Sequence, residues 1–259
     1  MKRLDDKDFD WKCHQSRVTE FFDIHSNDYS TLFHAGTKSG AAFVFRKRLI
    51  IVADLVKGAS GRMLDCACGT GEITAVACSS GKFLNVTVND ISEKMLAFAR
   101  EELSKCKQAT EWQWTNADVF SLPKLLADEQ FDVVLCLGLL SHIGRLDLLL
   151  SSLRSLVKPS GILILQATLA DHWGVKLINL ITENRYRAGI QHRHYYYSIE
   201  VLVNSAKSSG YEVEHLHRFG LCIPGGDRIL RRANYYLEKI LNGRLRAHGA
   251  EAIIVLRKK

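Results

Sequence analysis

The sequence predicts an α/β fold: a doubly wound, Rossmann-like, mostly parallel seven-stranded sheet with helices on both faces and a helical cap. Short apolar runs alternate with helix-like segments from about residue 62, a pattern typical of a parallel sheet crossed by helices. Some runs are continuously apolar, as in VVLCL at 133–137, which indicates strands buried on both faces. A loop with two glycines follows the first run, where such sheets place a ligand.

Five apolar runs predict the parallel strands, and two later runs predict strands that close the sheet edge. The five runs are RMLDCA, FLNVTVND, EWQWTNAD, FDVVLCLG and GILILQA, and the later two are Tyr211–Phe219 and Ala250–Lys258. The segments GEITAVACSS and SEKMLAFAREELSKC predict helices between the first three runs. RLDLLLSSLRSLVKPSG predicts a helix before the fifth run, with its stop at Lys158–Gly161.

The chain divides into a predicted N-terminal helical lid at 1–60 and a core domain at 61–259. Two insertions, at about 168–200 and 224–246, are expected to cap the ligand site. An apolar helical face is predicted in the first, from Leu177, Ile178, Leu180 and Ile181. The second contains DRILRRANYYLEKIL, which predicts an amphipathic helix with these residues available for burial: Ile229, Leu230, Tyr236, Leu237 and Ile240.

Composition and charge bound the class of protein. The 259 residues carry a net charge of +7, with most of the basic excess after Arg185. That excess indicates either an anionic partner or solvated helix faces. Because no apolar run approaches the ~20 residues of a membrane span and the charged N-terminus has no signal-like core, we expect a cytoplasmic protein. The seven scattered cysteines are expected to be reduced.

The sequence predicts no metal ligand set. Cys66 and Cys68 are close in sequence, but a second Cys/His pair at zinc-finger spacing is missing.

The loop DCACGTG, at 65–71, is compatible with three kinds of ligand. A phosphate loop needs Lys-Ser/Thr after the second glycine, but Glu72-Ile73 follows here. A dinucleotide fingerprint needs a third glycine, and Thr74 stands in its place. The remaining candidate is a nucleoside cofactor with cationic groups, which the acids Asp65 and Glu72 suit.

Two more acids follow the next two predicted strands. Asp90 lies about twenty residues past the glycines, where a carboxylate can accept both ribose hydroxyls. Asp118 ends the third run and could accept the exocyclic amine of adenine, with Val119 or Phe120 against the ring. Either acid could instead be a helix N-cap. The three acids at successive strand ends favour a nucleoside site.

The motifs from Arg62 to Ala167 resemble those of the class I S-adenosylmethionine-dependent methyltransferases, in particular the small-molecule subset that includes ubiquinone/menaquinone-type enzymes. They are LDCACGTG, VTVNDISEKMLAFAR, NADVFSLP, FDVVLCLGLLSHI and LRSLVKPSGILIL. The resemblance implies S-adenosyl-L-methionine as cofactor. The cofactor-binding residues that we predict are Tyr29, Asp65, Ala67, Gly69, Gly71, Asp90, Ile91, Met95, Asp118, Val119, Leu137 and Gly138.

Within that resemblance the glycine loop lines the methionine end of the cofactor, Asp90 the ribose, and Asp118 the adenine. Ala67 departs from the family, which usually has its first glycine there. The N-terminal stretch VTEFFDIHSNDYSTLF resembles the lid helix of the subset, which puts Tyr29 near the cofactor carboxylate. Alternatively, this stretch is an amphipathic helix that only docks on the core.

Methyl transfer from a sulfonium depends mainly on positioning the acceptor in line with the methyl group. A hydroxyl or enol acceptor can also need a general base, and His142, after the fourth predicted strand, is the catalytic candidate. Alternatively, His142 orients the helix and the cofactor. The Leu137–Leu140 stretch lacks the Asn/Asp-Pro-Pro-aromatic tetrad of enzymes that methylate base amines, which disfavours that class.

The first insertion provides the predicted acceptor contacts. Its aromatic residues suit a flat or greasy acceptor and its Arg/His group an acidic one, although an oligomer interface or a solvated helix would explain them too. The substrate-binding candidates are His172, His194, Tyr195 and Tyr196.

The predicted function is methyl transfer to a small-molecule acceptor, at an oxygen of an aromatic or lipid-like metabolite. Alternatives are C- or N-methylation of a small metabolite, RNA methylation, a nicotinamide oxidoreductase, and a non-catalytic cofactor-binding protein. We expect no nucleic-acid partner and a monomer or homodimer. The basic, apolar segment around Leu177 leaves a peripheral membrane or lipid contact open.

Overall fold

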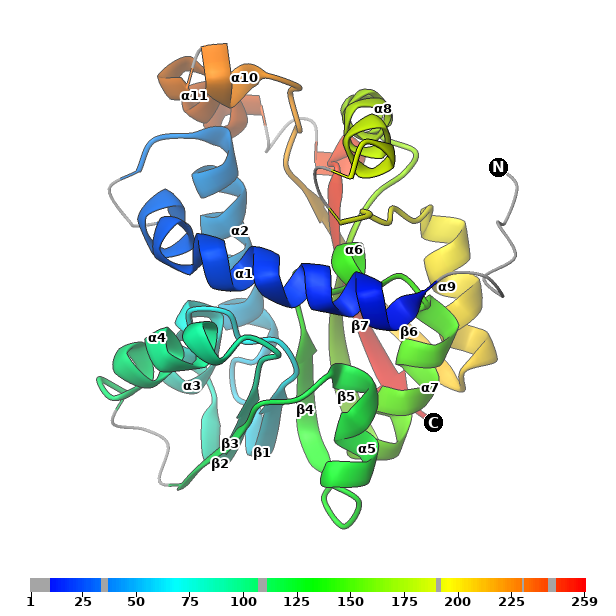
Figure 1. Ribbon diagram of the computed structural model, residues 1–259. Helices are drawn as coiled ribbons and strands as arrows, with labels where there is room; N and C mark the ends of the chain where they lie inside the picture. The colour runs from blue at the N-terminus through cyan, green and yellow to red at the C-terminus, as the bar shows by residue number, and fades with distance from the viewer. Residues whose placement is uncertain (1–9, 34–36, 107–110, 190–191, 230, 242–245) are drawn as a thin grey trace.

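A mixed β-sheet is the centre of the molecule (Figure 1). The computed structural model describes residues 10–33, 37–106, 111–189, 192–229, 231–241 and 246–259. Within these ranges seven strands lie in the order β3-β2-β1-β4-β5-β7-β6. Their bounds are β1 Ser60–Asp65, β2 Lys82–Asn89, β3 Glu111–Thr115, β4 Phe131–Cys136, β5 Val157–Thr168, β6 Tyr211–Phe219 and β7 Glu251–Lys258.

Strand direction confirms the predicted fold class. The pairs among β1 to β5 are parallel, and β7 is antiparallel to both of its neighbours, β5 and β6. Strand β1 pairs with β2 on one side and with β4 on the other, so the strand order reverses there. A crevice opens at such a switch point, beyond the carboxyl ends of the strands.

Helices cover both faces of the sheet (Figure 1). The longer ones are α1 Trp11–Phe33, α2 Gly40–Leu55, α3 Glu72–Ser80, α4 Glu93–Leu103, α7 Leu146–Leu156, α8 Trp173–Arg187, α9 Ile199–Ser208 and α11 Arg231–Leu241. The short ones are η2 Val119–Ser121, α5 Leu122–Leu125, α6 Leu140–Ile143, α10 Gly226–Ile229 and η3 Arg246–His248. Among the described helices, none combines the length and apolar character needed to cross a bilayer.

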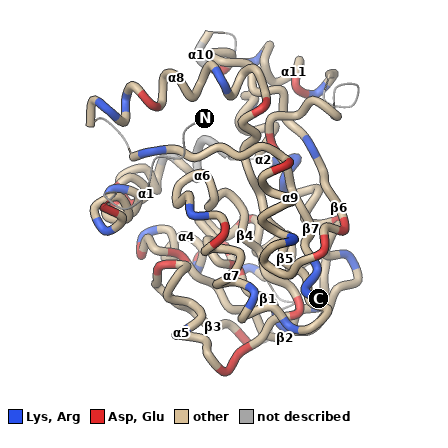
Figure 2. The backbone as a smooth tube through the Cα atoms, turned by 90° about the vertical axis from the view of Figure 1, so that its right-hand side faces the viewer, with Lys and Arg blue, Asp and Glu red and all other residues tan. Residues whose placement is uncertain are grey.

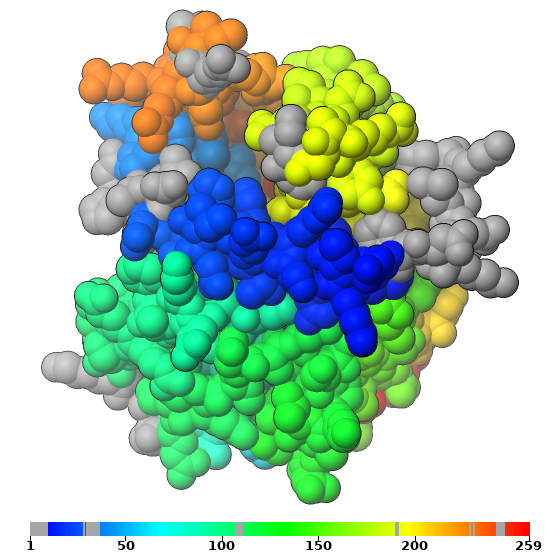
Figure 3. Space-filling model, in the orientation of Figure 1, coloured from blue at the N-terminus to red at the C-terminus, as the bar shows by residue number. Residues whose placement is uncertain are grey.

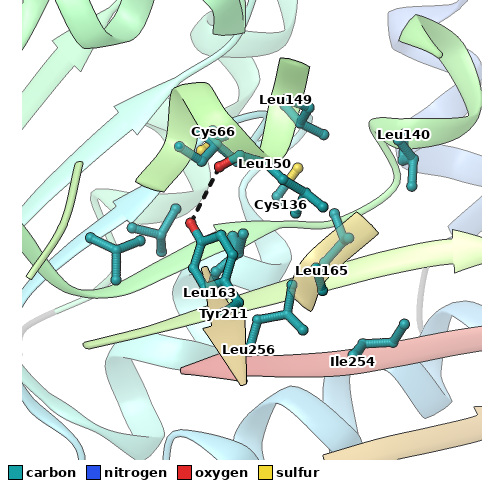
Figure 4. Close-up of a cluster of buried hydrophobic side chains, with 14 of the residues drawn as sticks. Cys66, Cys136, Leu140, Leu149, Leu150, Leu163, Leu165, Tyr211, Ile254 and Leu256 are labelled. Carbon is teal, nitrogen blue, oxygen red and sulfur yellow. Dashed lines mark hydrogen bonds between the residues drawn. The ribbon is translucent and has the colours of Figure 1, made fainter. Parts of the chain in front are cut away.

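Alternating strand residues divide the core into two layers. In β1, Met63 packs with α2, α3 and α4, whereas Leu64 packs with α5, α7 and α9. Successive residues of a strand point to opposite faces, so both faces of the central strands are buried. Figure 4 shows the second layer, where the Tyr211 hydroxyl of β6 donates a hydrogen bond to the Leu150 carbonyl of α7 at 3.5 Å.

The helix stop that was predicted at Lys158–Gly161 is confirmed, although the stretch itself belongs to β5. Helix α7 ends at Leu156, and the Lys158–Gly161 stretch lies inside β5 as an irregularity. The register with β4 passes from Phe131–Val157 to Val133–Ile162 across it. Proline has no N–H to donate to a strand ladder, so a strand accommodates it at such a break in register.

The predicted burial of the apolar face of α11 is wrong. Ile229 beside this helix is 78% exposed and Ile240 within it is 64% exposed, whereas Asn234 and Glu238 are buried. Glu238 accepts the backbone N–H of Leu221 through both carboxylate oxygens, at 2.8 and 2.9 Å. The polar face of α11, which accepts a hydrogen bond from the backbone of another segment, therefore points inward. The apolar face of the helix points to solvent. Leu230 lies outside the described residues.

Helix α8 also presents apolar side chains to solvent. Leu177, Leu180 and Ile181 are exposed, as is Trp173 at its start. The apolar helical face that was predicted after β5 is thus present, but it is not part of the core.

Candidate functional site

One cavity of about 1110 Å³, counted to its open mouth, lies at the switch point of the sheet. Its walls come from the loops after β1, β2, β3 and β4, together with α1 and α2. The polar, aromatic and glycine residues that line it include Trp11, His14, Tyr29, Arg48, Gly69, Glu72, Asp90, Asp118, Gly138, His142 and Arg145.

Helix α1 covers the cavity. Trp11, His14 and Phe22 from α1 line it, and Figure 3 shows this helix as a continuous band across the face of the molecule. Arg145, at the cavity mouth, has its guanidinium 4.8 Å from the centroid of the Trp11 ring and 5.1 Å from that of Phe120. These cation–π contacts join α1 to the core.

The glycine loop after β1 has a backbone conformation that residues with a side chain rarely adopt. Gly69 and Gly71 have φ of 54° and 90°, in the left-handed region, which glycine adopts without a Cβ clash. A Cβ on Gly71 would lie 3.0 Å from the Cα of Ala99 in α4. Gly71 therefore allows α3 and α4 to pack closely, while Gly69 faces the cavity.

Asp65 lies behind the loop rather than in the cavity wall. Its carboxylate accepts the Thr74 hydroxyl at 2.7 Å and the Ala67 N–H at 3.3 Å. The side chain is 2% exposed, and this burial raises the pKa of Asp65 from 3.8 to about 6 despite those bonds. Thr74, which replaces the third glycine of a dinucleotide fingerprint, is thus the partner of a buried acid.

Asp90 stands at the end of β2 and faces the cavity. One carboxylate oxygen accepts the Gly69 N–H at 2.9 Å, and the other accepts the Ser92 N–H at 2.9 Å. Burial raises the pKa of Asp90, and the backbone hydrogen bonds oppose that rise. Each oxygen keeps a further lone pair, so this fixed carboxylate can also accept hydrogen bonds from a ligand diol.

Asn89 ties the ends of three strands together, a role that the sequence did not indicate. Its amide group donates to the Cys66 carbonyl at 2.8 Å and to the Ala117 carbonyl at 3.0 Å. Its carbonyl accepts the Thr115 hydroxyl at 2.9 Å. The loops after β1 and β3 are thereby held against β2.

Asp118 lies in the cavity wall after β3. Its carboxylate accepts the Phe120 N–H at 3.2 Å, so it caps η2 as the alternative interpretation expected. Burial raises its pKa, while the positive charge of Arg145 opposes that rise. Capping uses only part of its accepting capacity, and the carboxylate remains at the cavity.

Arg48 of α2 brings a buried cation into the cavity, which the sequence analysis missed. Among the described residues, its Nε atom is buried and has no hydrogen-bond partner. A terminal nitrogen lies 3.4 Å from where a Cβ on Gly138 would be. Loss of water lowers the pKa of Arg48, whereas the nearby Tyr29 and Glu251 raise it. The run RKR at 46–48 looks like a solvated helix face, so sequence offered no signal for this contact.

His142 of α6 also lines the cavity and lies within a group of histidines. Its Nδ1 is 2.9 Å from Nε2 of His192, and its backbone carbonyl accepts a hydrogen bond from Nε2 of His14 at 2.7 Å. Burial and the other histidines hold the pKa of His142 well below 6.5. Its imidazole is therefore neutral near pH 7, with little affinity for a further proton.

A comparison with protein families matches the part of the chain that carries the loops of this site, but not α1 and α2. The family described as a methyltransferase domain matches residues 64–165, the stretch that contains the glycine loop, Asp90, Asp118 and His142. Over these residues the chain is similar to methyltransferase domains.

Curated relatives match a stretch of the chain of similar length. The chain is 34% identical over 108 residues to a Bacillus subtilis protein with the name "Putative methyltransferase YqeM", covering 40% of this chain and 41% of that protein. It is 31% identical over 99 residues to the ubiquinone/menaquinone biosynthesis C-methyltransferase UbiE of Paracoccus denitrificans, with coverage of 38% and 39%. The chain thus spans about two-fifths of the length of these relatives.

Solved structures share the fold over nearly the whole chain. The mycolic acid cyclopropane synthase CmaA1, complexed with SAH and CTAB, has a TM-score of 0.63 at 16% identity and covers 95% of this chain and 98% of its own. The [4+2]-cyclase SpnF has a TM-score of 0.62 at 16% identity, with coverage of 94% and 96%. At such identities the likeness shows the fold alone.

Most of the predicted cofactor residues of the methyltransferase domain meet in the cavity. The wall contains Tyr29, Ala67, Gly69, Asp90, Ile91, Met95, Asp118, Val119, Leu137 and Gly138. Asp65 and Gly71 support the loop from behind. Their roles toward a cofactor stay predictions.

The predicted acceptor residues of the domain lie outside the cavity lining. His172 accepts the Gly174 N–H at 3.1 Å and caps α8. Tyr196 contacts the Thr182 hydroxyl at 3.4 Å. The Tyr195 ring stacks 6.3 Å from that of Trp11, so it supports the lid helix. His194 belongs to the histidine group. The contacts of Tyr195 and His194 join segments distant in sequence, whereas His172 caps its own helix.

Proposed function

We propose that this protein transfers a methyl group from S-adenosylmethionine to a small-molecule acceptor. The observation that carries the proposal is the buried, unpartnered Nε of Arg48, within the described residues, in the same cavity as the glycine loop and Asp90. A nucleoside with a terminal amino-acid group would satisfy both the cation and the acid. Relatives named as ubiquinone biosynthesis O- and C-methyltransferases support the small-molecule class.

The residues present fit this cofactor at each end. Arg48, beside Tyr29, would pair with its carboxylate, because guanidinium–carboxylate pairs form strong charge-assisted bonds. The carboxylate of Asp90 would accept the ribose hydroxyls, and Asp118 with Val119 would hold the adenine. Glu72 and Asp90 make the loop acidic, which disfavours the pyrophosphate of a nicotinamide cofactor.

The cofactor supplies an electrophilic methyl group on a sulfonium. The chain's own contribution is to hold the acceptor in line with that methyl and to exclude water, a task for α1 and the Arg145–Trp11 contact over the cavity. We propose an oxygen acceptor, whose proton passes to His142 or to solvent. The neutral imidazole of His142 has the lone pair for this, although its lowered pKa makes it a weak base.

The exposed apolar faces of α8 and α11 favour a lipid-like acceptor taken from an anionic membrane surface. Both helices lie at the same end of the molecule in Figures 1 and 2. Leu180 and Ile240 are each 64% exposed, and arginines are exposed on both helices, among them Arg187 and Arg232. Apolar side chains flanked by basic ones bind the boundary between headgroups and acyl chains.

Vesicle binding tests this membrane contact. Ile240→Asp should reduce co-sedimentation with vesicles of phosphatidylglycerol and phosphatidylcholine by about fivefold or more, because it removes apolar contact and adds a negative charge. Leu125→Asp is the matched control, since Leu125 is 58% exposed on α5 at the opposite end. Equal binding by both variants and the unmodified protein would exclude the α11 face.

A cofactor titration tests the function itself. Calorimetry should show micromolar binding of S-adenosylmethionine and S-adenosylhomocysteine, and none of NAD(H) or NADP(H). Arg48→Met should weaken S-adenosylhomocysteine binding by roughly tenfold or more, because a buried carboxylate partner is lost. Binding of nicotinamide cofactors alone would overturn the proposal.

A further inference from the structure

Three histidines from distant parts of the chain meet beside the cavity. His142 lies in α6, while His192 and His194 follow α8. One ring nitrogen from each lies within 4.8 Å of those from the other two. We call these three residues the histidine cluster. The cysteine spacing predicted no metal ligands, and nothing in the sequence pattern brought residues 142 and 192 together.

The spacing of the cluster is close to that of metal ligands. Zinc–nitrogen bonds of about 2.0–2.1 Å in tetrahedral geometry separate two ligand nitrogens by about 3.3 Å. Nδ1 of His142 and Nε2 of His192 are 2.9 Å apart, so a small outward shift of each ring accommodates an ion. The ring centroids of His192 and His194 are 4.7 Å apart. The ligand nitrogen of His194 lies within 4.8 Å of the other two. A movement of about 1.5 Å or less therefore brings it to the separation expected for a third zinc ligand.

Contacts around the cluster hold its rings in place. His14 donates to the backbone carbonyl of His142 at 2.7 Å and anchors that residue to α1. The ring of Phe22 lies 5.0 Å from His142, edge to face, and that of Phe21 lies 5.0 Å from His192. These contacts limit the movement of His142 and His192.

His192 has an unsatisfied polar atom. It is 2% exposed, and within the described part of the chain its Nδ1 is buried without a hydrogen-bond partner. Burying an unpaired polar atom costs free energy. An ion would remove that cost only if the His192 ring turned so that Nδ1 became the ligand atom.

We propose that His142, His192 and His194 form a binding site for one divalent transition-metal ion of the zinc class at the wall of the cavity. Imidazole ligands suit zinc, copper, nickel and iron and disfavour magnesium and calcium. Three histidines with a fourth position for a non-protein ligand are the arrangement of catalytic rather than structural zinc sites. His142 belongs both to the cluster and to the cavity wall. A bound ion would therefore lie beside the cavity in which the acceptor is proposed to bind.

The use of this ion rests on the proposed function. An acceptor hydroxyl that becomes the fourth ligand has its pKa lowered by the metal charge. Its proton leaves to solvent, the oxygen lone pair forms the bond to the methyl carbon, and the carbon–sulfur bonding pair returns to sulfur. The weak basicity of His142 then matters little, because the ion rather than the imidazole activates the oxygen.

Metal titration tests the site without any activity measurement. Protein free of an affinity tag, with the exposed Cys13 replaced by serine, is stripped with chelator and titrated with Zn²⁺ and Co²⁺. We expect one ion per chain with a micromolar or lower Kd, a rise in Tm, and a Co²⁺ visible spectrum without thiolate charge transfer. His192→Ala and His194→Asn should each weaken binding by tenfold or more.

His215→Ala, at an exposed site on β6, is the matched control and should bind the ion like the parent protein. S-adenosylhomocysteine titration of each variant checks the fold and separates the two proposals. Nucleoside binding without metal binding overturns the metal site alone, and metal binding without nucleoside binding overturns the proposed function alone. Equal metal affinity in the parent protein and the His192→Ala/His194→Asn double variant also overturns the site.

Discussion

Asp65→Asn should change how the stability of the protein depends on pH. Burial raises the pKa of this carboxyl from 3.8 to about 6 in the folded protein. The folded state therefore prefers the protonated acid, and the charged form destabilises it. The contribution of Asp65 to the free energy of unfolding is most favourable below the pKa that this carboxyl has in the unfolded chain. That contribution falls as the pH rises from about 4 through about 6. Asparagine, which cannot ionise, removes that loss.

The size of the effect follows from the two pKa values. One pKa unit corresponds to about 1.4 kcal/mol, so the full loss is about 3 kcal/mol at high pH. Roughly 2 kcal/mol of it develops between about pH 4.5 and pH 7.5. The free energy of unfolding of Asp65→Asn, relative to the parent protein, should rise by that amount across the same interval.

Urea unfolding at both pH values, without cofactor, measures this difference. The hydrogen bond from Thr74 is altered in the variant at every pH. Only the change with pH in the free energy of unfolding, relative to the parent protein, therefore reports on the ionisation of Asp65. Asp54→Asn, at an exposed position in α2, serves as control and should follow the parent protein. If the difference between Asp65→Asn and the parent is the same at both pH values, the buried acid is not the cause and the reasoning fails.

Three further variants address the site. Asp90→Ala should weaken S-adenosylhomocysteine binding by more than tenfold in calorimetry, because a fixed carboxylate–diol contact is lost; unchanged affinity in folded protein would remove Asp90 from the site. Gly71→Ala should destabilise the protein by roughly 2 kcal/mol more than Gly58→Ala in urea unfolding, since both have positive φ but only the former meets backbone of Ala99; equal losses would refute the close packing. His142→Ala should lower turnover more than cofactor affinity, and unchanged turnover across pH would exclude it as base or metal ligand.

The sheet and the glycine loop were predictable because their signals are local. Continuously apolar strands such as β4 reflect burial on both faces, and the positive φ of Gly69 and Gly71 is a property of the loop itself. Asp90 and Asp118 follow strand ends that any parallel sheet brings to one edge. Each of these inferences depends on neighbouring residues and on one general rule of sheet topology.

Arg48, His14 and His192 were not predictable as site residues, and neither was the meeting of His142, His192 and His194 in one cluster. Arg48 and His14 lie on helices ahead of the core, and the side of a helix that faces a cavity depends on where that helix docks. His142 and His192 come together only because α1, α6 and the segment after α8 pack on one another. No local pattern encodes that distance.

Helix α11 illustrates the same division most clearly. Its sequence by itself determined a helix with one apolar and one polar side, because side chains repeat with the helical period. The tertiary structure alone decided which side points inward: Glu238 accepts backbone N–H groups of Leu221 and Cys222, and Asn234 bonds to Asp227. Backbone donors elsewhere in the fold outweighed apolar burial, so the side that sequence reasoning assigned to the core faces outward.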